Sequence, residues 1–562
     1  MEYNGEKIHT RTNSDARHCL IVANSIQQNR DNQTEVVCLH IVITGFVQGV
    51  GFRPFVFRLA NEMHIKGYVT NNAGQVTITA EANRQQIDLF CESLLSHAPV
   101  NAKPIIESVN ETSVVNFEEF SIRESSALNQ SDIHILSDLP VCEHCLNELF
   151  DKNNRRYLYP FINCTQCGPR NSIITTLPYD RKNTSMQCFT LCDDCNDEYL
   201  SPENHRFHAE PIACDTCGPV LNFVSDKHNI TENKRALEMC IEALKNGKVV
   251  AVKGIGGYHL MCDATSYEAI TLLRKRKQRA DKPFAVLMTL SQVECYVDAN
   301  ENETSLLQQS SRSIVLIRRK NEAEIPQNLA PGINRLGVML PSTPLQYLIC
   351  HYFQKPLIAT SANISGEPII TDNDDAKDKL TKLCDAFLHN NRTIVRPADD
   401  PVMLYNNIET QLIRTGRGLT PTEITLPFKL TKSVLAVGGH IKNTIALAWG
   451  NRLVISAHNG DLSSLRGYKI FQQSIKDLQQ LYQVNAEIIV CDAHPGYAST
   501  LWANKWATES NLPVVKVFHH YAHASSLALE SAGKYQNMKW LVFSWDGVGL
   551  GEDGTLWGEK LF

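Results

Sequence analysis

Eight cysteines in the middle of the chain have the spacing needed to hold metal ions. They form four CxxC pairs, with 18 residues between the first and second pair and again between the third and fourth. Two such pairs supply the four thiolates of a closed tetrahedral site, so we predict two structural zinc ions. The eight ligands expected are Cys142, Cys145, Cys164, Cys167, Cys192, Cys195, Cys214 and Cys217.

The repeat extends beyond the cysteines. Glu148 and Glu198, and likewise Arg156 and Arg206, recur at the same 50-residue offset, which indicates a tandem duplication of one small unit. Metal bonds stabilise a unit that is too small for a core of its own. The spacing leaves the pairing open: each unit closes its own site, or the first and last pairs share an ion. We expect His205 and His208 to pack or face solvent, because the cysteine count is already complete.

The length and composition indicate several ordinary globular domains. A chain of 562 residues suggests roughly three to five domains, and 43% apolar residues can fill their cores. No apolar run reaches the roughly 18 residues of a membrane span, and no apolar signal core is present. With metal-type cysteine pairs, these features favour the cytoplasm. The net charge of −6 disfavours general nucleic-acid binding. Residues 1–35 are polar, and we expect a poorly ordered tail.

A glycine-rich loop in the next region, residues 36–126, has the features of an anion site. It runs from Gly45 to Gly51, so that backbone N–H groups and a helix N-terminus can converge on a phosphate. Arg53 adds a forked cation, and Asn71 ends the following strand. The surrounding pattern predicts a ferredoxin-like α+β sandwich. Its expected strands are Val37–Thr44, Gly67–Asn71, Val76–Ala80 and Phe117–Ile122, and its expected helices are Phe52–Met63 and Ile87–Leu95.

The sequences GFVQGVGFR and GYVTN in this region resemble the acylphosphatase family. The resemblance implies that the loop and Arg53 hold the phosphate while Asn71 orients the attacking water. The alternative is a ferredoxin-like domain that only binds an anion.

Basic and small polar residues recur between residues 231 and 430. A helix, Ala236–Asn246, and a strand, Lys248–Lys253, precede a basic helix that we expect over Leu272–Leu287. A Ser/Asn/Gly loop lies in PLIATSANISGEP, and two arginines stand in RTGRGLTP. Basic residues at a helix end beside such a loop suit a nucleotide triphosphate.

In this order the segments resemble the YrdC-like domain, whose members bind ATP and form a carbamoyl-type adenylate. The resemblance assigns a K-x-R motif, an S-x-N motif and two closing arginines as the site for ATP with Mg. These residues are Lys277, Arg279, Lys282, Ser361, Asn363, Arg414 and Arg417. Pro401 stands where this family usually has serine after two aspartates, and we expect the change to be tolerated.

Two histidines near the end of the chain have a metal-ligand spacing. His519 and His523 are four residues apart, so on a helix they share one face, which His520 does not. Asp546 is expected to follow a strand over Trp540–Ser544.

Residues 431–562 resemble the opening of an actin-like ATPase fold of the Kae/TsaD branch. The expected strands are Val434–Val437, Ile445–Trp449, Arg452–Ser456 and Ile488–Cys491, and the AHxGDL-like segment holds His458, Gly460 and Asp461. The resemblance implies that His519, His523 and Asp546 bind a further metal.

The four segments in this order resemble the HypF family, the carbamoyltransferases of [NiFe]-hydrogenase maturation. The resemblance covers residues 36 to 562 and implies three steps. Carbamoyl phosphate is hydrolysed, ATP converts the carbamate to carbamoyl adenylate, and the carbamoyl group passes to the C-terminal Cys of the partner HypE for cyanide ligand synthesis. Neither a membrane nor a nucleic acid is expected as a partner.

The expected fold is therefore multidomain, α+β and α/β. A tail (1–35), an acylphosphatase-like domain (36–126), a tandem zinc module (127–230), a YrdC-like domain (231–430) and a first actin-like lobe (431–562) follow one another. Because the family continues through a second lobe, we expect an incomplete site and weak transfer from a chain ending at Phe562. Two alternatives remain: a threonylcarbamoyl-type tRNA-modification enzyme, and a non-catalytic zinc-dependent interaction protein.

Overall fold

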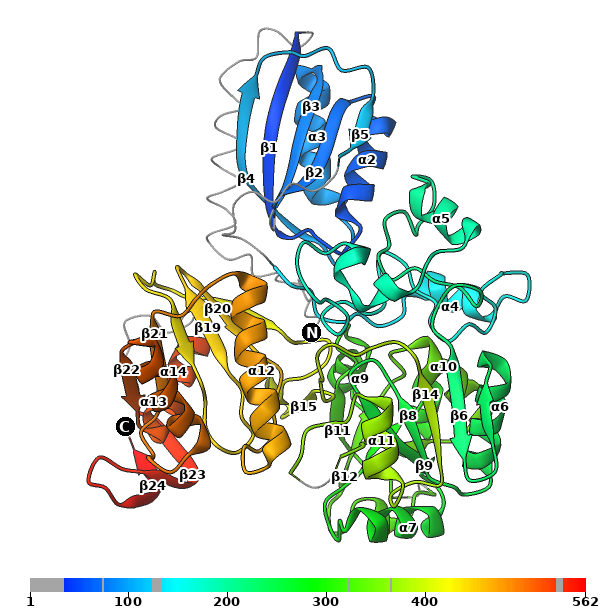
Figure 1. Cartoon of the computed structure of the whole chain (residues 1–562), viewed down its shortest axis with the longest axis vertical. Helices are drawn as coiled ribbons and strands as arrows, with labels where there is room; N and C mark the ends of the chain where they lie inside the picture. The colour runs from blue at the N-terminus through cyan, green and yellow to red at the C-terminus, as the bar shows by residue number, and fades with distance from the viewer. Residues whose placement is uncertain are drawn as a thin grey trace, which may run out of the picture. The chain divides into compact units, whose positions relative to one another are not determined.

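The chain folds into two compact units that divide between His134 and Ile135 (Figure 1). This computed structural model describes residues 35–72, 75–123, 134–321, 324–363, 366–531 and 539–561. The polar tail expected over residues 1–35 lies outside the described residues, apart from Glu35. Among the described residues, no helix is both long and apolar enough to cross a membrane.

Over its described residues, the first unit is a five-stranded sheet with two helices, in the strand order β4-β1-β3-β2-β5. Alternate residues of β1 are buried, including Ile41 and Ile43, because one face of the sheet packs against the helices. The predicted ferredoxin-like sandwich is confirmed. Its elements are β1 (Val36–Phe46), α2 (Phe52–Glu62), β2 (Lys66–Asn72), β3 (Gln75–Asn83), α3 (Arg84–Ser96), β4 (Lys103–Thr112) and β5 (Phe120–Ile122).

The fourth strand of the sandwich lies earlier in the chain than the sequence pattern placed it. β4 pairs antiparallel with β1, whereas the segment predicted over Phe117–Ile122 contains only the short edge strand β5, parallel to β2. Of the ten residues in β4, only Ile106 is buried. An edge strand with one buried residue carries no apolar alternation, which is why the pattern missed it.

The second unit begins with the cysteine-rich module. Two short helices, α4 (Glu143–Phe150) and α5 (Asp193–Leu200), occupy equivalent places in the two repeats. Cys142 caps the first helix and Cys192 the second, so one cysteine pair of each unit lies at a helix N-terminus. The positive end of the helix dipole favours thiolates there. Two 3₁₀ turns, η1 (Arg181–Asn183) and η2 (Ser185–Cys188), lie between the repeats.

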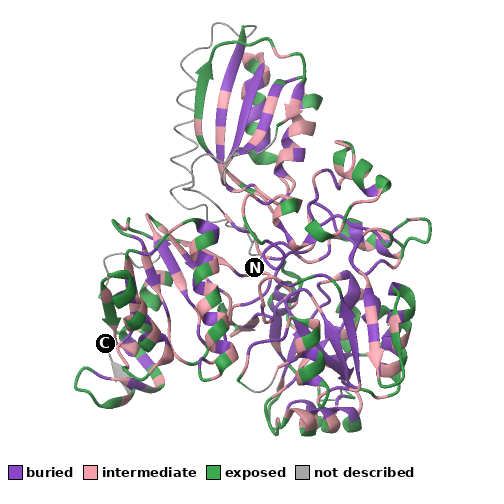
Figure 2. Cartoon of the chain, in the orientation of Figure 1, coloured by how far each residue is buried: buried purple, intermediate pink, exposed green. Residues whose placement is uncertain are grey.

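An eleven-stranded mixed sheet follows, in the order β16-β15-β11-β12-β10-β13-β9-β8-β14-β6-β7. Its strands are β6 (Leu221–Ser225), β7 (Asn229–Thr231), β8 (Val250–Lys253), β9 (Tyr258–Asp263), β10 (Ala285–Leu287), β11 (Ile314–Arg318), β12 (Arg335–Met339), β13 (Leu357–Ser361), β14 (Ala386–Asn390), β15 (Val402–Tyr405) and β16 (Thr410–Arg414). The helices are α6 (Asn233–Lys245), α7 (Tyr267–Lys277), α8 (Leu290–Tyr296), α9 (Glu301–Gln308), α10 (Pro344–Phe353) and α11 (Asn373–Leu380). Figure 2 shows the central strands buried, since apolar clusters pack on them. One cluster joins α6, α10 and the zinc module, and the other contains α7, α9 and α11.

The basic segment predicted as one helix over Leu272–Leu287 is helical only as far as Lys277. Gln278 adopts a left-handed conformation, with φ of 50°, and ends α7. The chain then turns, and its apolar end becomes β10, a central strand between β12 and β13. Burial in the sheet therefore overrides the helical pattern at the C-terminal end of the segment.

The last part of the chain is an actin-like lobe around a six-stranded sheet, in the order β17-β20-β19-β18-β21-β22. Its elements are β17 (Thr422–Thr425), β18 (Val434–Ala436), β19 (Ala446–Trp449), β20 (Arg452–Ile455), α12 (Leu465–Tyr482), β21 (Ile488–Asp492), α13 (Ala498–Ser510), β22 (Val514–Val517), α14 (His519–Ser531), β23 (Phe543–Leu550) and β24 (Leu556–Leu561). Asp546 was predicted to follow a strand but lies inside β23. It stands where the register of the pairing with β24 shifts, between Trp545 and Gly549. Such an irregularity redirects a side chain, which the sequence pattern does not reveal.

Candidate active sites and metal centres

The glycine-rich loop of the first unit brings Arg53 and Asn71 together. Gly51 caps α2 with φ of 74°, so the half-buried Arg53 stands in the first turn of that helix. Asn71, on β2, is buried. With its amide oxygen turned toward the guanidinium, Asn71 accepts hydrogen bonds from Nε of Arg53 at 3.0 Å and from Nη2 at 3.2 Å. The fork is thus held in place beside the positive end of a helix, an arrangement suited to one phosphate group.

The eight cysteines form two clusters, one in each repeat. Sγ of Cys142 lies 3.6 Å from Sγ of Cys164, and Cys164 lies 3.8 Å from Cys167. The corresponding separations in the second cluster are 3.7 and 3.8 Å. A tetrahedral ion with zinc–sulfur bonds of about 2.3 Å needs sulfur atoms about 3.8 Å apart, so both clusters fit zinc. Of the two pairings that the spacing allowed, the structure has the one in which each zinc repeat closes its own site.

The histidines near the cysteines do not belong to either cluster. His205 stacks on His144 with ring centroids 4.2 Å apart, and its Nε2 lies 3.7 Å from Glu148. His208 packs against Tyr199 and Phe207.

The predicted nucleotide residues converge where α7 and β13 end. Nζ of Lys277 donates to the Ser361 carbonyl oxygen at 2.7 Å and to Oδ1 of Asn363 at 3.2 Å. Ser361 Oγ also donates to Asn363 Oδ1, at 3.1 Å. Arg279 Nη1 reaches Oγ1 of Thr360 at 3.3 Å. The K-x-R and S-x-N motifs, more than 80 residues apart, thus line one site.

Burial, and after it the neighbouring cations, lowers the pKa values of this site. Burial, and then the charge of Arg279, lowers the pKa of Lys277 to about 7. Burial, and then Arg274 and Arg414, lowers the pKa of Arg279 to about 10. The pKa of Lys282 is lowered by burial and by its cationic neighbours. The site therefore holds positive charge that a polyphosphate would neutralise.

The two closing arginines differ in their surroundings. Arg417 is buried in an ion pair, with its Nη2 3.0 Å from Oδ1 of Asp400. His259 contacts the other oxygen of that carboxylate at 2.8 Å. Burial alone would raise the pKa of Asp400, but His259 and Arg417 hold it well below its usual range. Arg414 donates to the Asp400 backbone oxygen at 2.7 Å. Arg417 is therefore placed to anchor residues 414–417 to Asp400.

A segment of the actin-like lobe packs against the YrdC-like domain beside this site. Nδ1 of His458 lies 3.9 Å from Oδ2 of Asp399, whose charge also acts on Lys277. Arg466 donates to the carbonyl oxygens of Pro368 and Ile369, in the chain that follows the S-x-N motif. The AHxGDL-like segment thus forms part of the surroundings of the nucleotide residues.

A third group of ligand-type residues lies in the actin-like lobe. Nε2 of His519 is 3.3 Å from Oδ2 of Asp546, and Nε2 of His523 is 4.0 Å from the same oxygen. That buried oxygen accepts no hydrogen bond from the part of the chain that the structure describes. The donor set therefore fits a metal ion. His520 is buried on another face of α14, against Gly549 and Trp557.

Sequence reasoning missed Asp492 at this group. Its Oδ2 lies 2.8 Å from Nδ1 of His519, and this hydrogen bond raises the pKa of the histidine. A carboxylate behind a ligand histidine fixes its orientation. The available signal was an aspartate ending the buried strand IIVCD, with His494 two residues later.

Comparisons with known families cover each of these regions. Residues 39–122 match the acylphosphatase family, and residues 141–174 and 191–224 each match the HypF finger. Residues 242–416 match the Sua5, YciO and YrdC family described as telomere recombination. Residues 429–530 match the HypF Kae1-like domain.

Longer relatives and a solved structure match nearly the whole chain. Carbamoyltransferase HypF of Synechocystis sp. is 46% identical, over 92% of this chain and 67% of the relative. Carbamoyltransferase HypF2 of Cupriavidus necator is 40% identical, over 95% of this chain and 68% of the relative. A crystal structure of full-length HypF in the phosphate- and nucleotide-bound form superposes with a TM-score of 0.87 at 39% identity, covering 95% of this chain and 69% of that one.

These domains and sites define an ATP-dependent carbamoyltransferase that carries an acylphosphatase domain and two zinc-type cysteine clusters. The chain belongs to the HypF family, whose members are the carbamoyltransferases of hydrogenase maturation. The predicted family, fold class and enzyme class are confirmed. The tRNA-modification and non-catalytic alternatives lose their support.

Proposed function

We propose that carbamoyl phosphate is hydrolysed at the Arg53 site. Arg53 and the loop N–H groups neutralise the phosphate charge, and Asn71 orients the attacking water. Water attacks phosphorus, the bond from phosphorus to the carbamoyl oxygen breaks, and carbamate and phosphate leave. The support is the hydrogen-bonded pairing of Arg53 with Asn71 beside a helix N-terminus.

The carbamate is then activated at the Lys277 site. A carbamate oxygen attacks the α-phosphate of ATP, carried with Mg, and carbamoyl adenylate and pyrophosphate form. Lys277, Arg279 and Lys282 balance the triphosphate charge, while Ser361 and Asn363 position the reacting groups. The observation that carries this assignment is the convergence of Lys277, Ser361 and Asn363 from distant segments. Arg414 and Arg417 support the site from the closing loop, Arg417 through its ion pair with Asp400.

The actin-like lobe acts in the transfer step. The acceptor is the C-terminal Cys of HypE, whose thiolate attacks the carbamoyl carbon and releases AMP. His519, His523 and Asp546 are the residues that would hold a metal in this lobe, and Asp492 orients His519. A bound metal ion would supply Lewis-acid polarisation of an oxygen.

The test is exchange between ATP and labelled pyrophosphate, because exchange reports adenylate formation without the acceptor. We expect exchange that depends on carbamoyl phosphate. Exchange that requires threonine and bicarbonate, with no response to carbamoyl phosphate, would contradict the proposal in favour of threonylcarbamoyl chemistry.

A further inference from the structure

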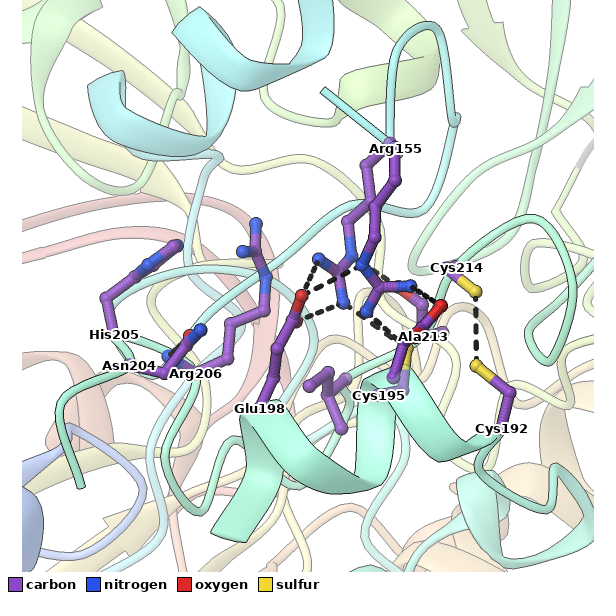
Figure 3. A network of polar contacts seen from close by, with 12 residues as sticks. Arg155, Cys192, Cys195, Glu198, Asn204, His205, Arg206, Ala213 and Cys214 are labelled. Atoms are coloured by element: carbon purple, nitrogen blue, oxygen red, sulfur yellow. Dashed lines mark hydrogen bonds and ion pairs between the residues drawn. The ribbon is translucent and has the colours of Figure 1, made fainter. Parts of the chain in front are cut away.

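The arginines repeated in the two zinc units contact the opposite unit. Arg156 belongs to the first repeat, yet its Nη2 lies 3.3 Å from Sγ of Cys195 and its Nε donates to the Ala213 carbonyl oxygen at 2.9 Å. Figure 3 labels these two partners, Cys195 and Ala213. Both partners belong to the second repeat. The guanidinium of the first unit therefore lies beside a thiolate of the second cluster.

The second repeat makes the same contacts in return. Nη2 of Arg206 lies 3.9 Å from Sγ of Cys145, and its Nε donates to the Asn163 carbonyl oxygen at 3.0 Å. Cys145 and Asn163, the partners of Arg206, stand 50 residues before Cys195 and Ala213, the partners of Arg156. The internal duplication thus produces a reciprocal exchange of arginines between the units.

The charges are exchanged in the same way. Arg156 pairs with Glu198 at 2.6 Å, and Arg206 pairs with Glu148. The two arginine side chains are only 1% and 2% exposed. A buried guanidinium requires partners for its charge and its N–H groups, and here the opposite unit supplies the thiolate, the carboxylate and a carbonyl oxygen.

This arrangement bears on metal binding. Four thiolates around one Zn²⁺ leave net negative charge on the cluster, and a nearby guanidinium lowers the cost of that charge. Groups that contact metal ligands in this way typically change metal affinity by about 10- to 100-fold.

We propose that the two zinc sites are stabilised crosswise. Arg156 of the first zinc repeat stabilises the thiolates that bind the ion of the second cluster, and Arg206 of the second zinc repeat stabilises those of the first cluster. The module then keeps both ions only while its two units remain docked. This explains why the arginine and the glutamate recur together with the cysteines at the 50-residue offset.

The exchange is unequal. Arg155 adds a second guanidinium to Cys195, with Nη2 3.1 Å from Sγ, and also contacts Glu198 at 2.9 Å. The repeat-related position holds His205, which faces Glu148. The ion of the second cluster therefore has two guanidinium groups of the first zinc repeat beside it, whereas the ion of the first cluster has one from the second zinc repeat.

The test follows zinc loss at each cluster separately. The zinc-loaded full chain is mixed with a chelator and iodoacetamide, and mass spectrometry measures the initial alkylation rate of each cysteine. In Arg156→Gln we expect cysteines 192–217 of the second cluster to be alkylated about tenfold faster or more, ahead of the first cluster. In Arg206→Gln the first cluster should be alkylated first, ahead of the second.

A control variant separates this effect from a general loss of charge. Lys152→Gln removes an exposed cation from the same loop and should leave both rates unchanged. If Arg156→Gln accelerates alkylation in its own unit first, or in both units equally from the start, the crosswise proposal is wrong. Should Arg156→Gln fail to load two ions, Arg155→Gln, which alters a far more exposed residue than Arg156, must still accelerate the second cluster selectively. Unchanged rates in Arg155→Gln would then overturn the proposal.

Discussion

The two sites that we propose for anion binding would meet negative charge in different ways. At the acylphosphatase-type site, one guanidinium is fixed by a neutral partner, since Arg53 is hydrogen-bonded to the buried Asn71. At the YrdC-type site, several cations crowd together, and burial and repulsion lower the pKa of Lys277 to about 7. The first site is ordered in advance for a single phosphate group. The second site holds several cations without enough negative charge to neutralise them, which suits a triphosphate. Its affinity for a nucleotide should therefore depend on pH.

Arg53→Ala gives the largest expected effect. Because one fork meets the phosphate charge, its loss should reduce carbamoyl phosphate hydrolysis by about 10²- to 10³-fold or more. Hydrolysis is measured by phosphate release, together with a melting curve to show that the fold is intact.

Arg58→Ala, on the same helix, is the matched control and should retain hydrolysis. Normal hydrolysis by a folded Arg53→Ala variant would refute the assignment and remove the contrast between the two sites.

Lys277→Ala comes next in size, because the crowded site shares its charge among several cations. The loss of one charge-assisted contact corresponds to about 10- to 100-fold in carbamoyl-phosphate-dependent ATP–pyrophosphate exchange. Phosphate release at the Arg53 site should stay unchanged. Lys275→Ala, an exposed lysine on the same helix, serves as control. A folded Lys277→Ala variant that loses both activities equally would show that the two sites do not act separately.

The sequence predicted those parts of the fold that carry local patterns. The glycine loop before α2, the cysteine spacing and the helical spacing of His519 and His523 each define a motif within a few residues. The prediction from sequence failed for elements whose secondary structure depends on tertiary contacts. β4 has one buried residue and gains its place by pairing with β1, and the end of the basic helix becomes a strand because the sheet buries it. The domain boundaries stay a prediction.

The missed site residues have a common cause. Asp492 meets His519 across 27 residues, and His259 meets Asp400 across 141. Each is an ordinary polar residue at a strand end or in a strand, and its partner is identified only when the chain is folded. The crossed arginines belong to this class too: their repetition is visible in the sequence, but the exchange between units is not.

The pH dependence of nucleotide binding sharpens the contrast between the sites. A bound polyphosphate favours the ammonium form of Lys277 and raises its pKa above the value of about 7. Below that pH the lysine is already charged and affinity is full. Above it, binding must take up a proton, so affinity should fall by up to about tenfold per pH unit until the pKa of the bound state is reached.

The measurement is the Kd of a non-hydrolysable ATP analogue across this range. Lys277→Arg is the comparison, because arginine keeps its charge and the slope from this position should disappear. The same slope in both proteins would assign the pH dependence to the nucleotide or to another residue.

The smallest expected effect concerns His458, through which the actin-like lobe reaches the crowded site. Its ring lies 3.9 Å from Asp399, and burial lowers its pKa, so the neutral ring leaves the carboxylate charge near Lys277 largely uncompensated. His458→Gln keeps a polar side chain but changes this packing. An interaction of roughly 0.5–1 kcal/mol at such a distance corresponds to a change of about two- to fivefold in the KM for ATP during exchange.

The control for this last variant is His494→Gln, a histidine that stacks on Tyr497 within the same lobe. Because Asp399 belongs to the YrdC-like domain, Asp399→Asn should remove most of the further effect of His458→Gln if the two residues act as a pair. Additive effects of the two substitutions would mean that the lobe acts on the nucleotide site by another route. A coupled effect would show that the charge balance of the second site, unlike that of the Arg53 site, is set by residues from two domains.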